Sequence, residues 1–424
     1  MKKRPYRAVK VKQVEKKDIE TMVAGHAVVI GIDVAKTDMV AAVVTESAQA
    51  LVTVKWSHPE ETSDFLAFLN GLREVSESVV VGMEPTGTYG DALRYQLLSQ
   101  GYDVQRVSPL RVKHSCELFD GVASSHDGKA AAIISKLVKD GTSEAWPMMS
   151  EDQRRLKAVA KAYDLYQKQY QSGLGQLEAE LARYWPEISA IIDLDRSSLW
   201  QLLIEVGGPE KIARARDKSF AVLRKAGGYF LKTERIEAIL ESAEKTCGVP
   251  MHPAELAWLE QLADHLLTSH LACNKAKREL EQACAWAPSV AAMASTVGKA
   301  TAAMLVAELG DPTRYKSAAA YEKAYGLNLR ERSSGKHRGQ LRITKRGPGK
   351  ARKFLFLSAM RLMRDDPTIS AWVDAKPEHG AGWKIKRLVG LMRKLARALW
   401  HMVTNQEHFD ITRFIDVKRL ELTA

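Results

Sequence analysis

Several common features are scarce or absent in this sequence, and each shortage excludes a class of protein or site. The four cysteines form no Cys-x-x-Cys pair and no histidine stands at ligand spacing to them, so we expect reduced thiols and no zinc site. No apolar run reaches the roughly 18 residues that suggest a membrane-spanning helix. Aromatic residues make up only 7% of the chain, so base stacking on single strands is not the obvious binding mode.

Recognition sequences for several ligands are also missing. The chain has no GxxxxGKS/T loop for nucleotide phosphates, no C₂H₂ finger spacing and no RRM signature. Residues 1–25 are basic but lack the apolar core of a signal peptide. We therefore expect a cytoplasmic protein without a membrane partner, whose first residues form either a phosphate-contacting arm or a solvated tail.

Positive charge, in contrast, is in excess. Lys and Arg total 63 against 51 Asp and Glu, which gives a net charge of +12 and a pI near 9.3. This balance favours a polyanionic partner, with nucleic acid preferred to an anionic membrane. The excess is densest in residues 330–353, which hold ten Lys or Arg and one acid, Glu331. Binding through such residues should weaken steeply with salt.

The pattern of apolar residues divides the chain into a basic arm, an α/β domain, a helical region and a mostly helical C-terminal domain. Their predicted bounds are 1–25, 26–148, 149–289 and 290–424. The second part alternates strand-like runs with helical periods, including a hairpin that turns near residues 46–49. Two long helical segments, 150–192 and 252–287, predict an antiparallel or intermolecular coiled coil, or a plain bundle. Between them, residues 195–250 have the character of a helical insert.

A weak internal repeat flanks the second long segment. LLIEVGGPEKIARA at 202–215 is similar to LVAELGDPTRYKSA at 305–318. The second copy follows MASTVGKATAA, where Gly298 and Lys299 form a turn like that of a helix-hairpin-helix element. Backbone N–H groups at such a turn can hold a phosphate. A plain helical hairpin with a glycine cap is equally compatible with the pattern.

Two acids follow apolar, strand-like runs. Asp33 ends VVIGID and Glu84 ends SVVVGME. If the two strands are neighbours, both carboxylates point into one crevice, and Asp127 would face them from a helix. Three carboxylates at one point repel, and Mg²⁺ (or Mn²⁺) would relieve that repulsion. Two such ions about 3.5–4 Å apart support phosphodiester cleavage. The alternative is three unrelated surface or capping carboxylates.

Several motifs in a fixed order resemble one protein family. They are GIDVAKTD, EPTGTY, SPLRVK and SSHDGKAAAI in residues 28–146, and VGKATA, AELGD, AYGLNL, SSG, ITKRG and KLARALWHM in residues 290–410. The chain resembles the Asp-Glu-Asp-Asp insertion-sequence transposases of the insertion sequence one-ten group. This implies a RuvC-like, RNase H-type N-terminal domain and a C-terminal serine transposase domain. It also implies a homo-oligomer, a dimer or tetramer, that recombines double-stranded donor and target DNA on the prokaryotic nucleoid, guided by a structured bridge RNA.

One position departs from the family pattern. The family helix carries two acids three residues apart, which places them one turn apart on one face. Here Asp127 is followed by Ala130, whose methyl group cannot bind a metal. Either a nearby acid substitutes, or the site is impaired. Because the surrounding SSHDGKAAAI otherwise fits, an engineered replacement of Asp by Ala is the preferred hypothesis.

A serine pair lies in the most basic stretch. The hydroxyls of Ser333 and Ser334 need a base or a metal for activation, and cations to stabilise charge on a phosphate. The stretch supplies the cations, and His337 is its one obvious base. Without the resemblance, this would be a phosphate-binding or flexible loop. The resemblance implies that Ser334, rather than Ser333, forms a covalent phosphoserine link, which conserves phosphodiester energy for rejoining without ATP.

Basic residues around this loop and the Gly298 turn are expected to contact nucleic acid. They are Arg330, Arg332, Lys336, Arg338, Arg342, Lys345, Arg346, Lys350, Gly298 and Lys299. The sequence thus predicts a transposase in which the metal-binding acids work with Ser334. Two alternatives stay open: a junction-resolving nuclease that uses metal-activated water, and a non-catalytic nucleic-acid-binding protein.

Overall fold

The computed structural model describes residues 6–46, 50–331, 339, 341–374 and 383–415. The chain divides into two compact units, Met1–Met149 and Ser150–Ala424. Each unit has its own hydrophobic core. They are therefore described separately.

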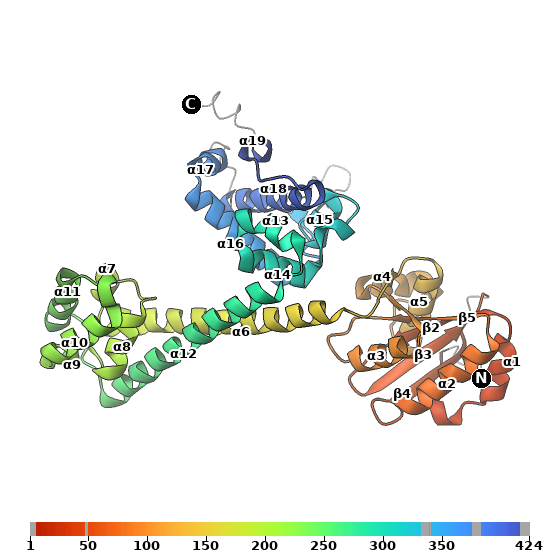
Figure 1. Ribbon diagram of the computed structural model, residues 1–424. Helices are drawn as coiled ribbons and strands as arrows, with labels where there is room; N and C mark the ends of the chain where they lie inside the picture. The colour runs from red at the N-terminus through yellow and green to blue at the C-terminus, as the bar shows by residue number, and fades with distance from the viewer. Residues whose placement is uncertain (1–5, 47–49, 332–338, 340, 375–382, 416–424) are drawn as a thin grey trace. The chain divides into compact units, whose positions relative to one another are not determined.

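A seven-stranded sheet forms the centre of the first unit (Figure 1). Its strands are β1 (Val9–Lys10), β2 (Ala27–Asp33), β3 (Asp38–Val44), β4 (Ala50–Ser57), β5 (Ser78–Met83), β6 (Asp103–Arg106) and β7 (Glu144–Ala145). They lie in the order β1-β4-β3-β2-β5-β6-β7. β2, β3 and β4 pair antiparallel, as the predicted hairpin requires, and its turn includes residues 47–49, outside the described residues. β2, β5 and β6 run parallel, so their carboxyl ends share one edge.

Helices cover both faces of this sheet. The helices on one face are α1 (Lys16–Val23), α2 (Thr62–Val75) and α3 (Asp91–Ser99), and those on the other are α4 (Pro109–Asp120) and α5 (Asp127–Lys139). Since both faces are covered, β3 is buried at every position from Met39 to Val44. A continuous apolar run is the sequence pattern of a strand covered on both sides.

The position of α5 is set by close contact with β2. A Cβ atom at Gly31 would lie 2.2 Å from the carbonyl oxygen of Ala131, so only glycine fits where the helix crosses the strand. The Ser135 hydroxyl donates to the carbonyl oxygen of Ala42 at 3.1 Å. These contacts hold the helix that begins with Asp127 against the central strands.

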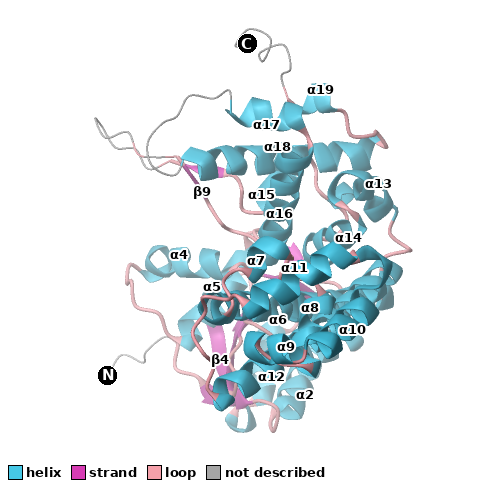
Figure 2. Ribbon diagram, turned by 90° about the vertical axis from the view of Figure 1, so that its left-hand side faces the viewer, coloured by secondary structure: helices cyan, strands magenta, loops and turns pink. Residues whose placement is uncertain are grey.

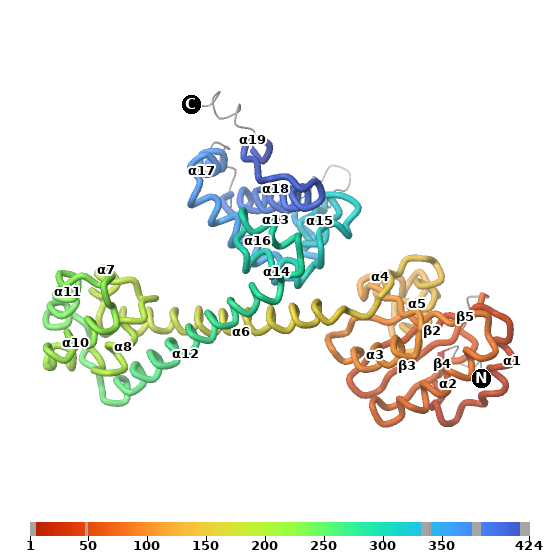
Figure 3. Tube along the Cα trace, in the orientation of Figure 1, coloured from red at the N-terminus to blue at the C-terminus, as the bar shows by residue number. Residues whose placement is uncertain are grey.

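Two long helices of the second unit run side by side in opposite directions (Figure 3). They are α6 (Glu151–Tyr184) and α12 (Pro253–Ala283). Gly173 packs on Leu266, whose Cδ2 would lie 2.9 Å from a Cβ at that glycine. Further along, the Trp258 indole donates to Glu180 at 3.0 Å. The two segments predicted to pair therefore do so within one chain.

Shorter helices between α6 and α12 form a distal helical domain. They are α7 (Ile188–Ile191), α8 (Ser197–Glu205), α9 (Pro209–Arg214), α10 (Arg216–Gly227), the 3-10 helix η2 (Gly228–Phe230) and α11 (Thr233–Glu244). Their core includes Leu181 of α6 and Leu259 of α12. The predicted repeat has a local structural counterpart: Gly207 and Gly310 both have positive φ, 112° and 77°, and a proline begins a helical turn two residues later.

The remaining elements pack on the other end of the long helices, against Leu156 of α6 and Leu280 of α12. They are α13 (Pro288–Val297), α14 (Lys299–Leu309), η3 (Pro312–Arg314), α15 (Ala318–Ala324), β8 (Leu329–Arg330), β9 (Arg342–Ile343), α16 (Gly349–Asp365), α17 (Pro367–Asp374), α18 (Trp383–Asn405) and α19 (Ile411–Phe414). Figure 2 shows β9 as a short strand among helices. An α/β N-terminal domain followed by a mainly helical region is thus confirmed. Within the described ranges, no helix is both long and apolar enough to cross a membrane.

Candidate active site

Asp33 and Glu84 lie at the shared edge where two parallel strands end. Asp33 is the last residue of β2, and Glu84 directly follows β5. Ile32 and Met83, the residues just before them, are direct partners in the parallel ladder. The two acids therefore lie opposite each other, in the crevice outside the strand ends where α/β sheets commonly bind ligands.

The three predicted acids are electrostatically coupled. Burial, followed by the charge of Asp127, raises the pKa of Asp33 to about 6. Burial, followed by the charge of Asp33, raises the pKa of Glu84 to about 7. Such coupling requires the carboxylates to be near one another. At neutral pH the cluster therefore concentrates negative charge that a bound cation would stabilise.

Carboxylate oxygens are the ligands that Mg²⁺ and Mn²⁺ prefer, so the chemistry of the cluster fits such an ion. The side chains are, however, not arranged around one common point. Across the residues that the structure describes, no three His, Cys, Asp or Glu side chains are arranged closely enough to hold a metal. Asp33, Glu84 and Asp127 would therefore need to adjust their side chains in order to share an ion.

The buried Lys129 holds the loop that precedes Asp127, and its role could not be read from the sequence. Lys129 is 1% exposed, and its Nζ donates to Asp120 Oδ1 at 2.6 Å and to the carbonyl oxygens of Val122 and Ser124 at 2.6 and 3.0 Å. These bonds fix the loop that leads into α5. His126 caps the helix, with Nδ1 accepting from the Lys129 backbone N–H at 3.2 Å. The signal in the sequence was a lysine within the apolar stretch GKAAAII.

Ala130 lies one turn beyond Asp127 on α5 and is 8% exposed. It belongs to an apolar cluster that includes Val112 and Cys116 of α4 and Ile133 and Ile134 of α5. A methyl group beside other apolar groups thus occupies the position at which the sequence resemblance implies a fourth acid.

Ser334, together with Arg332, Lys336 and Arg338, lies outside the described residues. The strands that flank these residues are described: β8 and β9 pair antiparallel, with Arg330 opposite Arg342. Below this pair, one Arg352 nitrogen, Nη1, donates to the carbonyl oxygens of Tyr325, Lys345 and Gly347 at 3.1, 3.2 and 2.7 Å. The strands on either side of residues 331–341 are therefore paired, and Arg352 holds the backbone next to them.

The other predicted nucleic-acid contacts differ in their surroundings. Arg330, Lys345 and Arg346 are exposed, whereas Lys350 is paired with Asp164 at 3.6 Å and with Glu308 at 3.8 Å. Lys350 therefore also ties α16 to α6 and α14.

Gly298, with φ of 79°, joins α13 to α14, and Lys299 beside it is exposed. Arg361 supports this turn by donating to the carbonyl oxygen of Thr296 at 3.3 Å. Two cationic side chains thus lie at the predicted hairpin.

Known families match two segments of this chain. Residues 30–186 match the DEDD transposase family of the IS110 type, and residues 293–374 match the Transposase IS116/IS110/IS902 family. The first segment contains the acid cluster, and the second contains the Gly298 turn and Ser334. Together they span more than half of the 424 residues.

The acids at the strand ends and these two matches define an insertion-sequence transposase. The chain belongs to the IS110 transposase family. A relative from Streptomyces coelicolor, the insertion element IS110 uncharacterized 43.6 kDa protein, is 23% identical over 323 residues. That similarity covers 73% of this chain and 78% of the relative.

Proposed function

We propose that this transposase cuts and rejoins DNA strands through a covalent phosphoserine at Ser334, with Mg²⁺ (or Mn²⁺) at Asp33, Glu84 and Asp127. The observation that carries the proposal is the coupled acid cluster at the strand ends, where burial and mutual repulsion raise pKa values. Buried like charges weaken a fold unless something compensates them. A divalent cation bound there would compensate these charges and could also neutralise a DNA phosphate.

In the proposed reaction, Ser334 Oγ attacks the phosphorus atom of a DNA phosphodiester. The new Oγ–P bond replaces the bond from phosphorus to one deoxyribose oxygen, and that oxygen leaves with a proton as the serine hydroxyl loses its own. Attack by the freed deoxyribose oxygen of another strand reverses the step and rejoins DNA. A bound divalent ion would supply charge stabilisation at the phosphate. The cations Arg330, Lys345 and Arg346 are suited to hold the neighbouring phosphates.

The same proposal includes a structured bridge RNA that selects the DNA site. The sequence contains no finger spacing or RRM signature by which side chains would read bases. Base pairing between a guide and the target would provide that specificity instead. A chain with a net charge of +12 can hold a folded RNA through its backbone and shape.

A second candidate is a non-catalytic nucleic-acid-binding protein. Ala130 favours it, since a methyl group stands where the family has an acid and packs in an apolar cluster. In that case the chain would bind the same DNA and RNA without cutting either.

The test is to trap the covalent link on suicide-nicked DNA, with Mg²⁺ and the copurifying RNA present. We expect a protein–DNA adduct from the chain carrying Ala130→Asp and no adduct when Ser334→Ala is added. Ser333→Ala is the matched control and should retain the adduct. Cleavage that survives Ser334→Ala without any adduct would instead support a nuclease that uses water.

A further inference from the structure

Two aromatic side chains of the distal helical domain, in the turn between α10 and α11, are almost completely exposed. Tyr229 and Phe230 are each 96% exposed, more than any other large apolar side chain among the described residues. They are adjacent in η2, the turn between α10 and α11. Solvent exposure of two neighbouring rings leaves apolar surface without a partner, which commonly marks a binding site.

The turn that carries the two rings is held by contacts with the domain core. Leu231, the next residue, is buried in the domain core, and its Cβ would lie 2.3 Å from a Cβ at Gly227. The Arg224 side chain donates to the carbonyl oxygen of Leu231 at 3.5 Å. The chain therefore folds tightly, with Leu231 inward and the two rings outward.

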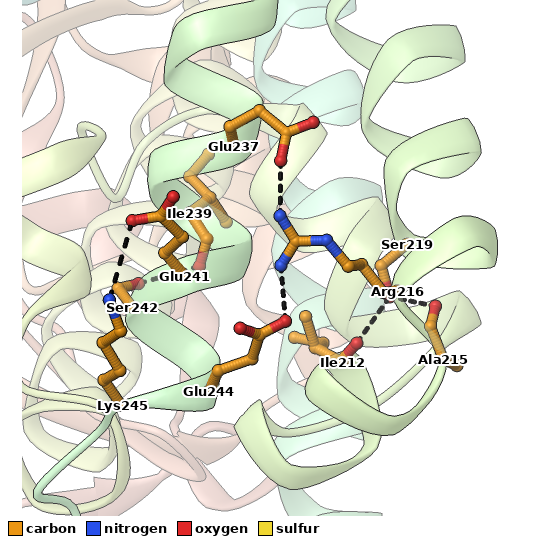
Figure 4. A network of polar contacts seen from close by, with 10 residues as sticks. All are labelled: Ile212, Ala215, Arg216, Ser219, Glu237, Ile239, Glu241, Ser242, Glu244 and Lys245. Carbon is orange, nitrogen blue, oxygen red and sulfur yellow. Dashed lines mark hydrogen bonds and ion pairs between the residues drawn. The ribbon is translucent and has the colours of Figure 1, made fainter.

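The helices on either side of the turn are also fixed to each other. In Figure 4 the Arg216 guanidinium at the start of α10 reaches Glu237 and Glu244 of α11. The distance from Nη2 to Glu237 Oε2 is 2.5 Å. The Ser219 hydroxyl of α10 also donates to the carbonyl oxygens of Ile212 and Ala215, at 3.2 and 2.9 Å, and so fixes the start of this helix. A rigid support of this kind reduces the entropy that is lost when the rings bind a partner.

The surroundings of the rings are basic. Exposed side chains of Arg224, Lys225, Lys232 and Arg235 flank the turn, against one exposed acid, Glu234. A purely apolar protein partner would not need this charge, whereas a nucleic acid needs cations for its phosphates and rings for its bases. Aromatic rings beside cations are the usual combination that binds unpaired nucleotides.

We propose that Tyr229 and Phe230 form a stacking platform for unpaired bases in a loop of structured RNA. The RNA assignment rests on the proposed function, which includes a structured RNA. Loops of a folded RNA expose their bases, whereas the bases of a DNA duplex are stacked inside it. The platform is a site of its own, on a domain to which no role was assigned from the sequence.

The first experiment measures binding of the full chain to a fluorescein-labelled RNA hairpin with an unpaired loop. We expect Tyr229→Ala and Phe230→Ala each to weaken binding by roughly 5- to 150-fold, which is the usual range for loss of one stacked base. The same hairpin with abasic loop nucleotides should bind weakly to the native chain, with no further loss in the variants. A fully paired RNA should bind all chains equally. Tyr95→Ala, which removes an exposed aromatic ring from α3, is the matched control and should change nothing.

Salt dependence separates stacking from charge. Lys232→Gln and Arg235→Gln should each reduce the slope of log Kd against log salt by about 0.7, the value for one phosphate that the protein no longer neutralises. The aromatic variants should leave that slope unchanged. All these positions are exposed, so the melting temperature should stay the same and confirm that the variants fold.

A second experiment identifies the nucleic acid in the cellular complex. Ultraviolet crosslinking followed by mass spectrometry should find a ribonucleotide attached to the peptide containing Tyr229 and Phe230. A deoxyribonucleotide there overturns the RNA assignment. Unchanged hairpin binding by both alanine variants, or a change of oligomeric state in light scattering, overturns the platform. If no RNA copurifies, the guided mechanism fails, while the synthetic hairpin still decides whether the platform exists.

Discussion

At the scale of single residues, the acids suited to bind a metal also lower the stability of the fold when they ionise. Burial raises the pKa of Asp33 to about 6 and that of Glu84 to about 7, and each acid is also repelled by a neighbouring acid. An acid with a raised pKa in the folded state destabilises the fold as it ionises, so this cost grows as pH rises through these values. A divalent cation would offset the cost at neutral pH, which links folding to the proposed metal.

Ala130→Asp should increase Mg²⁺-dependent strand cleavage or exchange, because it would add a fourth carboxylate to the proposed metal site. Without metal the new carboxylate would lie in the apolar cluster with Val112 and Cys116 and should lower the melting temperature. Mg²⁺ at a concentration a hundred times its Kd should then raise the free energy of unfolding by about 2.7 kcal/mol. Thermal unfolding with and without Mg²⁺, beside a cleavage assay, measures both effects.

Ala130→Asn is the control for this substitution. Its amide has nearly the same shape as the carboxylate but is a neutral and weaker metal ligand. It should gain neither cleavage nor Mg²⁺-dependent stability. Equal gains from Asn and Asp, or no gain from Asp, would contradict the metal-site explanation.

Lys129→Met should destabilise the first unit by about 1–3 kcal/mol, since Asp120 and two carbonyl oxygens lose their buried donor. Lys136→Met on the same helix is the matched control, because its ion pair with Asp140 is partly exposed at 3.1 Å and should matter little. Urea unfolding measures both variants. Equal stability of the two would show that the buried lysine does not hold the loop before Asp127.

At the scale of elements, one carboxylate joins two segments of the distal helical domain. Glu187, just before α7, accepts the backbone N–H of Cys247 at 2.9 Å and the hydroxyl of Thr246 at 2.8 Å. In the same segment Gly248 passes so close to Tyr184 that a Cβ would lie 2.0 Å from its carbonyl oxygen. These contacts join the end of α6 to the segment that leads into α12.

Glu187→Gln should lower stability at neutral pH by about 1 kcal/mol, since the group is partly exposed and solvent screens its charge. The Cys247 N–H, with the other donors, lowers the pKa of Glu187 from 4.5 to about 2. A lowered pKa stabilises the fold above pH 4.5, and that contribution is lost as pH falls towards 2. Chemical unfolding across this range should show the two chains converging at acid pH.

The exposed Glu210, paired with Arg214 within α9, is the matched control. Glu210→Gln should have little effect at any pH. A constant difference between Glu187→Gln and the native chain from pH 7 to pH 2 would rule out the ionised carboxylate as the cause.

At the scale of the whole molecule, the proposed catalytic groups belong to different units. Asp33, Glu84 and Asp127 lie in residues 1–149, whereas Ser334 belongs to residues 150–424. Each unit has its own hydrophobic core. An oligomer, as proposed from the sequence, would allow the acids of one subunit to work with the serine of another.

Mixing two inactive variants tests that arrangement. Chains with Asp33→Ala and chains with Ser334→Ala, both carrying Ala130→Asp, should each be inactive alone. When they are coexpressed, a mixed oligomer contains one intact pair of acid cluster and serine, and recombination should return. If the mixture stays as inactive as its components while mixed oligomers form, the acids and the serine act within one chain.

The two acids at the strand ends can be predicted from the sequence, because the pattern that marks them is local. An apolar run that ends in an acid predicts a strand with a carboxylate at its end, and two such runs predicted the Asp33–Glu84 pair. The burial of Lys129 could not be predicted, since a lysine is normally exposed and only the loop folded around it explains its burial. The 7% aromatic content did not predict base stacking, although two adjacent rings suffice if the fold exposes them together.

Residue types at short spacing account for the α/β pattern after residue 26, the long helical segments, the basic surplus, the acid motifs and the resemblance to a transposase family. They did not predict β1 and α1, which form within residues 1–25, the stretch expected to be an arm or a tail. Contacts between distant parts of the chain account for the rest. The tertiary structure placed β5 beside β2, which brings Asp33 and Glu84 together, and it surrounded Ala130 with apolar groups. It also turned Tyr229 and Phe230 outward. Burial and charge coupling depend on residues far apart along the chain, so no local pattern encodes them.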